Sequence, residues 1–295
     1  MSILSTPTRN SALIATELDQ KRKNGPLKSI VIPPCPALLR DLKNAMGAAE
    51  PDLNEVARIA GSDVAMSATL LRNANGAMFA SGQPVHTVGQ AMNRLGLRES
   101  AALMTAFLVR HAIPVNHPKL RDFWDEASQS AGTLHFIARQ LPGLSPELAQ
   151  LYGLFQHVGM PVLLQSLRGY GGTLTEAAAR KDRPFIATEN ANHRTDHAVV
   201  GALVAQAWHL PANLVAAIRL HHDNTALSDN GIEPEARTLV AAGLLADRMR
   251  RLRLTLPPDA DWQAMGQQAL DWLGSSEQDL EEWLQMEQDQ EAAAA

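Results

Sequence analysis

The chain has 295 residues, of which 45% are hydrophobic and only 4% are aromatic, so it can bury a core of aliphatic side chains. Ala and Leu are strong helix formers, whereas strands favour β-branched and aromatic residues, so the composition favours an all-α fold. The formal net charge of −5 argues against general nucleic-acid binding, which needs a basic surface.

The sequence also bears on the cellular location. No run approaches about 18 uninterrupted apolar residues, so we expect no membrane contact. The single cysteine, Cys35, cannot form an internal disulfide or a cysteine-rich zinc site, which suits a reducing compartment. The first residues lack the apolar core of a signal peptide. We therefore expect a cytoplasmic protein.

The first third of the chain predicts an arm and several short helices. Residues 1–26 are expected to form the arm, with one helix over 12–23 that ends at Asn24-Gly25-Pro26. A Pro-rich segment, 32–36, then leads into a helix with apolar residues at helical spacing. Further helices are predicted over 54–61, 63–75, 87–96 and 98–111. Thr87 to Gln90 fits a capping box.

Longer helices are predicted after residue 118. The Ser145-Pro146 pair is a good helix start, and Thr173 to Glu176 fits a second capping box. We find no convincing strand and no internal repeat. The predicted helices cover 119–141, 145–167, 195–208, 211–222, 234–253, 259–273 and 276–290.

Six motifs, in order and at matching spacing, resemble the HDOD domain family over residues 27–225. Each motif alone is weak, and together they are specific. They are Ile32-Pro33-Pro34-Cys35-Pro36, Ser62-Asp63 before Leu70-Leu71-Arg72-Asn73-Ala74-Asn75, Ala91-Met92-Asn93-Arg94-Leu95-Gly96-Leu97-Arg98, Gly153-Leu154-Phe155-Gln156-His157-Val158-Gly159, Asp196-His197-Ala198-Val199-Val200-Gly201, and Ala217-Ile218-Arg219-Leu220-His221-His222.

The resemblance implies a two-part helical HDOD domain over 27–225. An N-terminal helical subdomain, about 27–115, is expected to pack on a degenerate HD-like helical bundle, about 116–253. Residues 226–295 are expected to form a C-terminal helical extension with an acidic, Trp-bearing tail.

The family resembles the HD phosphohydrolases, whose His and Asp residues hold divalent metals that activate water. Here the His-Asp pair reads Gln156-His157. A neutral amide is a poor metal ligand, and a histidine brings no negative charge. The Lys that follows in HD-GYP phosphodiesterases falls at Met160, and an earlier His is missing from 125–128, where only Glu126 could substitute.

Other candidate ligands of the relict pocket remain. His197, His221 and His222 match histidines that HD-GYP relatives use for metal, and Asp247 resembles the final Asp of HD enzymes. With Gln156 and His157, they could brace the helices as buried polar residues, hold an organic ligand, or hold a metal. We predict no cofactor. If a metal is bound, its ligands are expected among His157, His197, His221, His222 and Asp247.

A mildly basic body carries an acidic tail. The residues up to Arg253 have a net charge of +5, and the ten acidic residues after it are joined by no Lys or Arg. A basic cluster at 248–253 could face this tail or an acidic partner. Trp residues in the tail could dock on the domain or serve as binding hot spots. The candidate partner-binding residues are Trp272, Trp283, Arg250 and Arg251.

The resemblance thus implies a non-catalytic, bacterial signal-transduction or regulatory protein that binds signalling proteins. The charge and the lack of long apolar runs predict no nucleic-acid or membrane partner, and a homodimer is possible. This hypothesis predicts no stoichiometric metal. The alternatives are a residual metal-dependent phosphohydrolase, which needs the histidines and Asp247 to converge, and a module that senses a nucleotide in the relict pocket. The partner, the pathway and the docking of the tail stay open.

Overall fold

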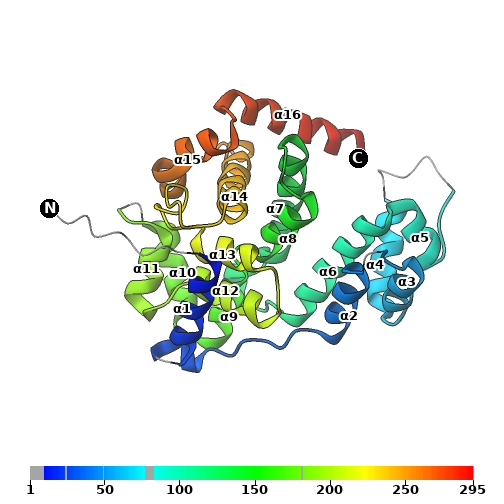
Figure 1. The fold of residues 1–295 in the computed structure, drawn as a ribbon, viewed down its shortest axis with the longest axis horizontal. Coiled ribbons are helices and arrows are strands. Elements are labelled where there is room, and N and C mark those ends of the chain that lie inside the picture. Colours follow the sequence, from blue (N-terminus) through cyan, green and yellow to red (C-terminus); the bar gives the residue numbers. More distant parts are fainter. Residues whose placement is uncertain (1–9, 24, 49, 77–82, 181, 295) are drawn as a thin grey trace. The chain divides into compact units, whose positions relative to one another are not determined.

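The computed structural model of the chain describes residues 10–23, 25–48, 50–76, 83–180 and 182–294. Within these ranges the regular secondary structure is helical and no strand occurs, which confirms the predicted all-α fold (Figure 1). The chain divides into a large unit, Met1–Pro33 with Val115–Leu284, and a small unit, Pro34–Pro114 with Gln285–Ala295. The domain borders predicted from the sequence, at 26/27 and 225/226, stay predictions.

The small unit is built on amphipathic helices. Its core consists of aliphatic and Met side chains such as Leu39, Ile59, Met66 and Leu70, all of which are buried. The helices are α2 (Ala37–Met46), α3 (Leu53–Gly61), α4 (Val64–Ala74), α5 (Val88–Leu95) and α6 (Leu97–Ala112).

Side-chain caps fix where α3, α4 and α5 begin. The Asp63 carboxylate accepts hydrogen bonds from the N–H groups of Ala65 and Met66 at the start of α4. Thr87 and Gln90 form the predicted capping box at the start of α5. After α4, the Asn75 amide donates to the Val85 carbonyl oxygen and accepts from the Val85 N–H, which joins the end of α4 to the residues before α5.

The large unit holds the longer helices and the candidate site. Its elements are α1 (Ser11–Lys23), η1 (Gly25–Ser29), η3 (Pro118–Leu120), α7 (Phe123–Gln140), α8 (Pro146–Phe155), α9 (Gly159–Ser166), α10 (Tyr170–Ala179), α11 (Phe185–His193), α12 (His197–Ala207), α13 (Ala212–Leu220), α14 (Pro234–Arg253) and α15 (Ala260–Leu273). The last helix, α16 (Glu277–Ala294), is divided between the units at Leu284.

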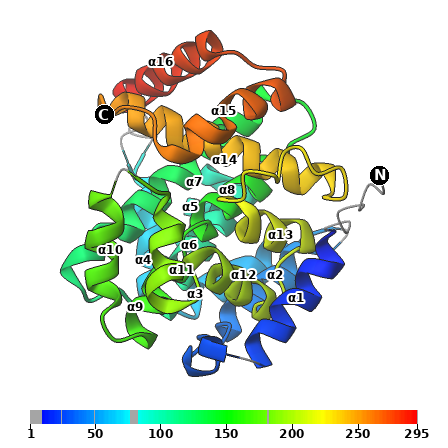
Figure 2. The same ribbon diagram turned by 90° about the vertical axis from the view of Figure 1, so that its left-hand side faces the viewer.

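Helix α12 is the most buried helix of the large unit, because every residue over 197–205 is buried. It packs against α9, α13 and α1, and Figure 2 shows α1 alongside α13. The predicted arm therefore carries a docked helix: Ile14 and Leu18 are buried, and the Ser11 N–H and hydroxyl donate to the Glu233 carboxylate.

Two glycines allow α9 and α12 to approach closely. A Cβ atom on Gly159 would lie 2.0 Å from the His197 carbonyl oxygen and 2.7 Å from the Gly201 nitrogen. Only a residue without a side chain fits between these backbones. The approach sets the turn before α9 directly against the first residue of α12.

The predicted single helix over 145–167 is wrong. Helix α8 ends at Phe155 and α9 begins at Gly159, with a turn over 156–158 between them. Pro161 explains the break: it has no N–H to donate to His157, but it fits the first turn of a new helix, where that donor is not needed. The break turns His157 out of a helical register.

Three smaller predictions also fail. The capping box at Thr173 is wrong, because α10 begins at Tyr170 after Gly169, whose φ of 86° requires a glycine-like backbone. Helix α11 was missed, since its sequence has little helical periodicity. The helix predicted from residue 119 begins only at Phe123, after the short η3 helix.

Among the described residues, no helix combines the length and the hydropathy that crossing a membrane requires.

Candidate functional site

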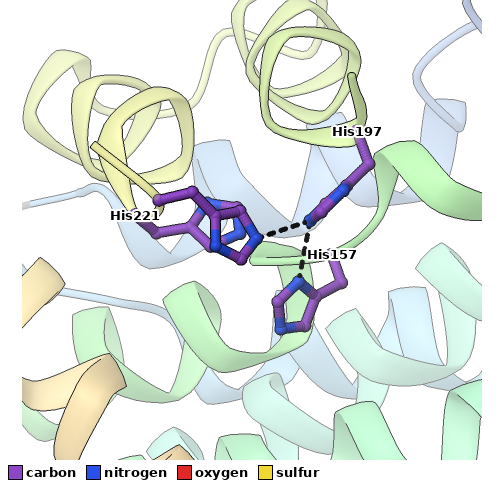
Figure 3. Close-up of side chains that lie close together, drawn as sticks. His157, His197 and His221 are labelled. Carbon is purple, nitrogen blue, oxygen red and sulfur yellow. Dashed lines mark hydrogen bonds between the residues drawn. The ribbon is translucent and has the colours of Figure 1, made fainter. Parts of the chain in front are cut away.

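Four histidines bring their ring nitrogens together inside the large unit. His157 lies in the turn between α8 and α9, His197 is the first residue of α12, and His221 and His222 directly follow α13. One nitrogen of each lies within 4.8 Å of the others. Figure 3 shows the rings of His157, His197 and His221 turned towards one another. We call these four residues the histidine cluster.

His197 lies at the middle of this cluster. Its Nε2 is 3.2 Å from His157 Nδ1 and 3.1 Å from His222 Nε2 (Figure 3). The His221 ring centroid lies 5.3 Å from that of His197 and 5.0 Å from that of His157. His197 is fully buried and His221 is 3% exposed, so these nitrogens face one another away from bulk water.

Three of the four rings have their other nitrogen fixed by an acceptor. His197 Nδ1 is 2.7 Å from Glu189 Oε2, and His222 Nδ1 is 2.7 Å from Asp261 Oδ2. His221 Nδ1 lies 2.7 Å from the Ile218 carbonyl oxygen. Because these oxygens only accept, they hold a proton on each Nδ1 and leave the Nε2 lone pairs for the cluster.

The environment keeps two rings neutral. Burial, followed by the nearby His197 and His222, holds the pKa of His157 well below its usual value. Burial and His222 do the same to the pKa of His221. Burial also lowers the pKa of His222, but the hydrogen bond to Asp261 and the charge of Asp261 outweigh it, so that the pKa of His222 is raised.

Gln156 and Asp247 form a separate contact. The Gln156 amide donates to Asp247 Oδ2 across 3.3 Å. Two buried polar atoms beside it, Gln156 Oε1 and the Tyr152 hydroxyl, have no hydrogen-bond partner among the described residues. Burial raises the pKa of Asp247 to about 6, although the charge of Arg250 lowers it. We call Gln156, Asp247 and Tyr152 the Gln156–Asp247 contact.

The six predicted pocket residues therefore divide into two groups. The four histidines converge, whereas Gln156 and Asp247 bond to each other, and Asp247 is not among the residues whose ligand atoms converge. Glu126, a possible substitute ligand, is exposed and stands outside the histidine cluster.

Two residues that support the histidine cluster were missed from the sequence. Glu189 is fully buried; one of its oxygens accepts from the Tyr170 hydroxyl and the other accepts from His197. It lies on α11, the helix that was not predicted. From the sequence, Asp261 counted only as one of the acidic residues of the tail, yet it bonds His222. An acidic residue in the first turn of a predicted helix is the one sequence signal that Asp261 offered.

The candidate partner-binding residues are partly engaged within the chain. The Trp272 indole donates to Thr238 Oγ1 across 3.0 Å, and the Arg237 guanidinium lies 3.8 Å above the Trp272 ring. Helix α15 packs along α14, so this part of the tail is docked. Arg251 donates to the Pro257 carbonyl oxygen. Trp283 on α16 and Arg250 on α14 are half-buried.

The basic cluster faces acidic residues of the same chain. Arg248 lies 3.9 Å from Glu277, and Arg251 lies 3.9 Å from Asp259. Both distances are at the limit of an ion pair, and such pairs contribute little individually. Both arginines nevertheless face acidic residues of the same chain, which agrees with an internal role for them.

Comparison with known proteins gives the family and the fold. The family model of the HDOD domain matches residues 32–224. An uncharacterized protein of Treponema pallidum (strain Nichols) is 24% identical over 225 residues, which are 76% of this chain and 42% of that protein. The match thus spans less than half the length of that relative.

Two solved structures share the fold. A protein of Marinobacter aquaeolei VT8, provisionally named a signal transduction protein, has 20% identity and a TM-score of 0.74 over 99% of this chain and 66% of its own. A protein of Shewanella amazonensis SB2B, provisionally named a phosphohydrolase, has 22% identity and a TM-score of 0.69 over 96% of this chain and 97% of its own.

Proposed function

This chain belongs to the HDOD domain family, and on that premise we propose that it is a non-catalytic regulatory module that binds signalling proteins. One observation carries the proposal: the two residues at the His-Asp position serve different neighbours. His157 joins three other imidazoles, and Gln156 bonds Asp247. The proteins of Marinobacter and Shewanella that share the fold are named for signal transduction and for phosphohydrolysis, and the first name supports the proposed regulatory role.

The charges at the site argue against hydrolysis. An HD-type hydrolase uses carboxylate ligands to hold metal ions that polarise substrate and activate water. Here both carboxylates near the histidine cluster, Glu189 and Asp261, are engaged as acceptors of ring nitrogens. Asp247 is bonded to the Gln156 amide. The histidine cluster itself therefore offers only neutral nitrogen ligands.

A turnover assay tests the absence of catalysis. The full chain, with Mn²⁺, Fe²⁺ or Zn²⁺ added, is offered phosphomonoesters, nucleotides and cyclic dinucleotides. We expect no hydrolysis that depends on His197. Turnover that His197→Ala abolishes would overturn the non-catalytic assignment and favour the alternative, a residual phosphohydrolase. The double variant Gln156→His with His157→Asp, which restores the pair, is the comparison for gained activity.

A binding measurement tests the regulatory half of the proposal. The tagged full chain is used to identify a partner in the native cell, and the complex is then rebuilt from purified proteins. Among the candidate residues, Trp283 makes no hydrogen bond to another described residue, so Trp283→Ala is the informative variant. We expect a loss of about 30-fold or more in affinity, as for a binding hot spot.

Gln278→Ala, an exposed change on the same helix, is the matched control and should leave affinity unchanged. A purified complex that tolerates both substitutions would remove Trp283 from the interface. Failure of every co-purified protein to bind the purified chain would count against the protein-binding function itself.

A further inference from the structure

We propose that the histidine cluster is a closed binding site for one borderline divalent transition-metal ion, held by His157 Nδ1 and by the Nε2 atoms of His197, His221 and His222. This reverses our expectation of no metal cofactor. It goes beyond the proposed function, because a regulatory module needs no metal and metal binding can fail while partner binding holds.

The first argument is the direction of the lone pairs. The acceptors on His197, His221 and His222 each hold the Nδ1 proton, so the three Nε2 atoms keep their lone pairs free for a ligand, and one nitrogen of each ring lies within 4.8 Å of the others. In metal sites, the second nitrogen of a ligand histidine is usually held in the same way by a carboxylate or a carbonyl oxygen. Here three rings are held in this way.

The second argument is that hydrogen bonding alone does not satisfy the cluster. His197 Nε2 has one in-plane lone pair, yet two ring nitrogens lie within 3.2 Å of it. His221 Nε2 is buried and has no hydrogen-bond partner among the described residues. A buried polar atom without a partner is costly. A single cation among the four nitrogens would satisfy all of them at once.

The third argument is size and charge. In a tetrahedral site with metal–nitrogen bonds of about 2.0–2.1 Å, neighbouring nitrogens lie roughly 3.3 Å apart. Two separations here are 3.1 and 3.2 Å, close to that spacing, and all four nitrogens lie within 4.8 Å of one another. Small rotations of the rings are needed to bring the remaining nitrogens to a common ion. The carboxylates of Glu189 and Asp261, each on an outer ring nitrogen, balance the two charges of the ion.

The donor set selects the class of metal. Imidazole nitrogen suits Zn²⁺, Cu²⁺, Ni²⁺ and Co²⁺, whereas Mg²⁺ and Ca²⁺ require oxygen ligands. Four protein nitrogens fill a tetrahedral shell and leave no position for water or substrate, which is the pattern of structural zinc sites. The bound ion would join the turn after α8, the start of α12 and the end of α13.

Asp261 extends this site to the tail. It is the second residue of α15 and bonds the outer nitrogen of His222. Outer partners of this kind orient the ligand ring, and their loss typically weakens metal binding by about 10- to 100-fold. Asp261 is therefore a positioning residue: Asp261→Asn should lower the affinity and keep the stoichiometry.

The experiment uses the full chain stripped with a chelator. Zn²⁺ is added back, excess ion is removed, and the metal content is measured by mass spectrometry. Co²⁺ is titrated in parallel, because its visible absorption reports four-coordinate binding. We expect about one ion per chain, a tetrahedral Co²⁺ spectrum, and no retention of Mg²⁺. Wild-type protein that retains no Zn²⁺ or Co²⁺ would overturn the site without any variant.

Two variants locate the ion. His157→Gln should abolish stoichiometric binding, and His209→Gln, an exposed histidine outside the cluster, should leave it intact. Circular dichroism of the metal-free proteins verifies folding. Equal binding by the wild type and a folded His157→Gln variant would overturn the assignment. If His157→Gln does not fold, the Co²⁺ affinity of Asp261→Asn decides instead, and an unchanged affinity would count against the site.

Discussion

Neighbouring residues 156 and 157 lead to two regions that differ in how their polar side chains are supported by residues around them. In the histidine cluster, three rings have an acceptor on Nδ1 at 2.7 Å. In the Gln156–Asp247 contact, two buried polar atoms have no partner among the described residues, and the joining hydrogen bond is 3.3 Å long. The cluster is thus supported from outside and the contact is not.

This difference indicates which part of the HD-like pocket the chain still builds. Glu189 on α11 and Asp261 on α15 support the histidines, so these two helices are tied to the cluster by hydrogen bonds. The Gln156–Asp247 contact has an aspartate whose pKa is raised to about 6 by burial, which indicates a poorly compensated carboxyl group. The predictions below alter one region and leave the other.

The largest effect is expected at Gly159, which holds the cluster together from the backbone. Gly159→Ala would place Cβ 2.0 Å from the His197 carbonyl oxygen, so α9 and α12 would have to separate. We expect a loss of about 4 kcal/mol or more in the free energy of unfolding, or failure to fold, measured by urea denaturation.

Gly132→Ala is the matched control for this substitution. Gly132 is exposed on α7, and a Cβ there meets no atom within 4 Å. Removing a glycine from a helix interior should stabilise the protein by about 0.5–1 kcal/mol. A Gly159→Ala variant as stable as the wild type would contradict the close approach of α9 and α12.

The next effect is expected at Glu189, the buried support of the cluster. Its oxygens accept from the Tyr170 hydroxyl, the His197 ring and the His197 N–H. Glu189→Gln replaces one acceptor oxygen by an NH2 group, so one of these buried donors loses its acceptor. We expect a loss of about 1–3 kcal/mol in unfolding free energy.

Glu176→Gln provides the comparison, because Glu176 is a solvent-accessible carboxylate that accepts from Asn192 and Arg180. Contacts that water can replace contribute little to stability, so the loss in unfolding free energy should be smaller than at Glu189. Equal losses at the two positions would show that the buried support of His197 has no special weight.

The Gln156–Asp247 contact is tested by pH. The pKa of Asp247 rises from 3.8 to about 6 on folding, so between these values the folded protein binds a proton that the unfolded chain releases. The unfolding free energy should therefore fall as pH rises through this interval. Asp247→Asn should remove that fall and be more stable than the wild type at pH 7 by about 1–3 kcal/mol.

The measurement is the difference between wild type and variant in urea denaturation from pH 4 to 8, with chelator present. Asp182→Asn is the control with the opposite expected change in unfolding free energy. The hydrogen bond from Arg180 lowers the pKa of Asp182, so removing this carboxylate should destabilise the protein at neutral pH. A stability difference between the wild type and the Asp247→Asn variant that does not change with pH would refute the raised pKa.

The sequence predicted the fold better than it predicted the site. Helical spacing, proline and capping residues gave most helices, because these signals are local. The break at Gln156 was missed although Pro161 signals it, and α11 was missed because its faces are weakly distinguished. Both errors fall on segments that carry the site. Packing between distant segments, such as Gly159 against His197, decides those elements, and no local pattern records it.

The candidate residues were found by motif, but their grouping was not. The motifs predicted that His157, His197, His221 and His222 share a pocket, and the structure brings them together. They also predicted Asp247 as a companion, which instead bonds Gln156. Glu189 and Asp261 could not be predicted, because a hydrogen bond to the outer nitrogen of a histidine depends on helix positions fixed only in three dimensions.

The smallest effect is expected at Thr238, where the tail is docked away from the cluster. Thr238→Val removes the acceptor of the Trp272 indole, which is half-buried and keeps the Arg237 guanidinium above its ring. We expect a loss of about 1 kcal/mol in unfolding free energy.

Because Asp261 still bonds His222 in the Thr238→Val variant, its Co²⁺ affinity should stay unchanged. Asp261→Asn should do the reverse and weaken Co²⁺ binding by about 10- to 100-fold. If Thr238→Val weakened Co²⁺ binding as much as Asp261→Asn, the histidine cluster would be positioned by the docking of the whole of α15 rather than by the Asp261 carboxylate alone.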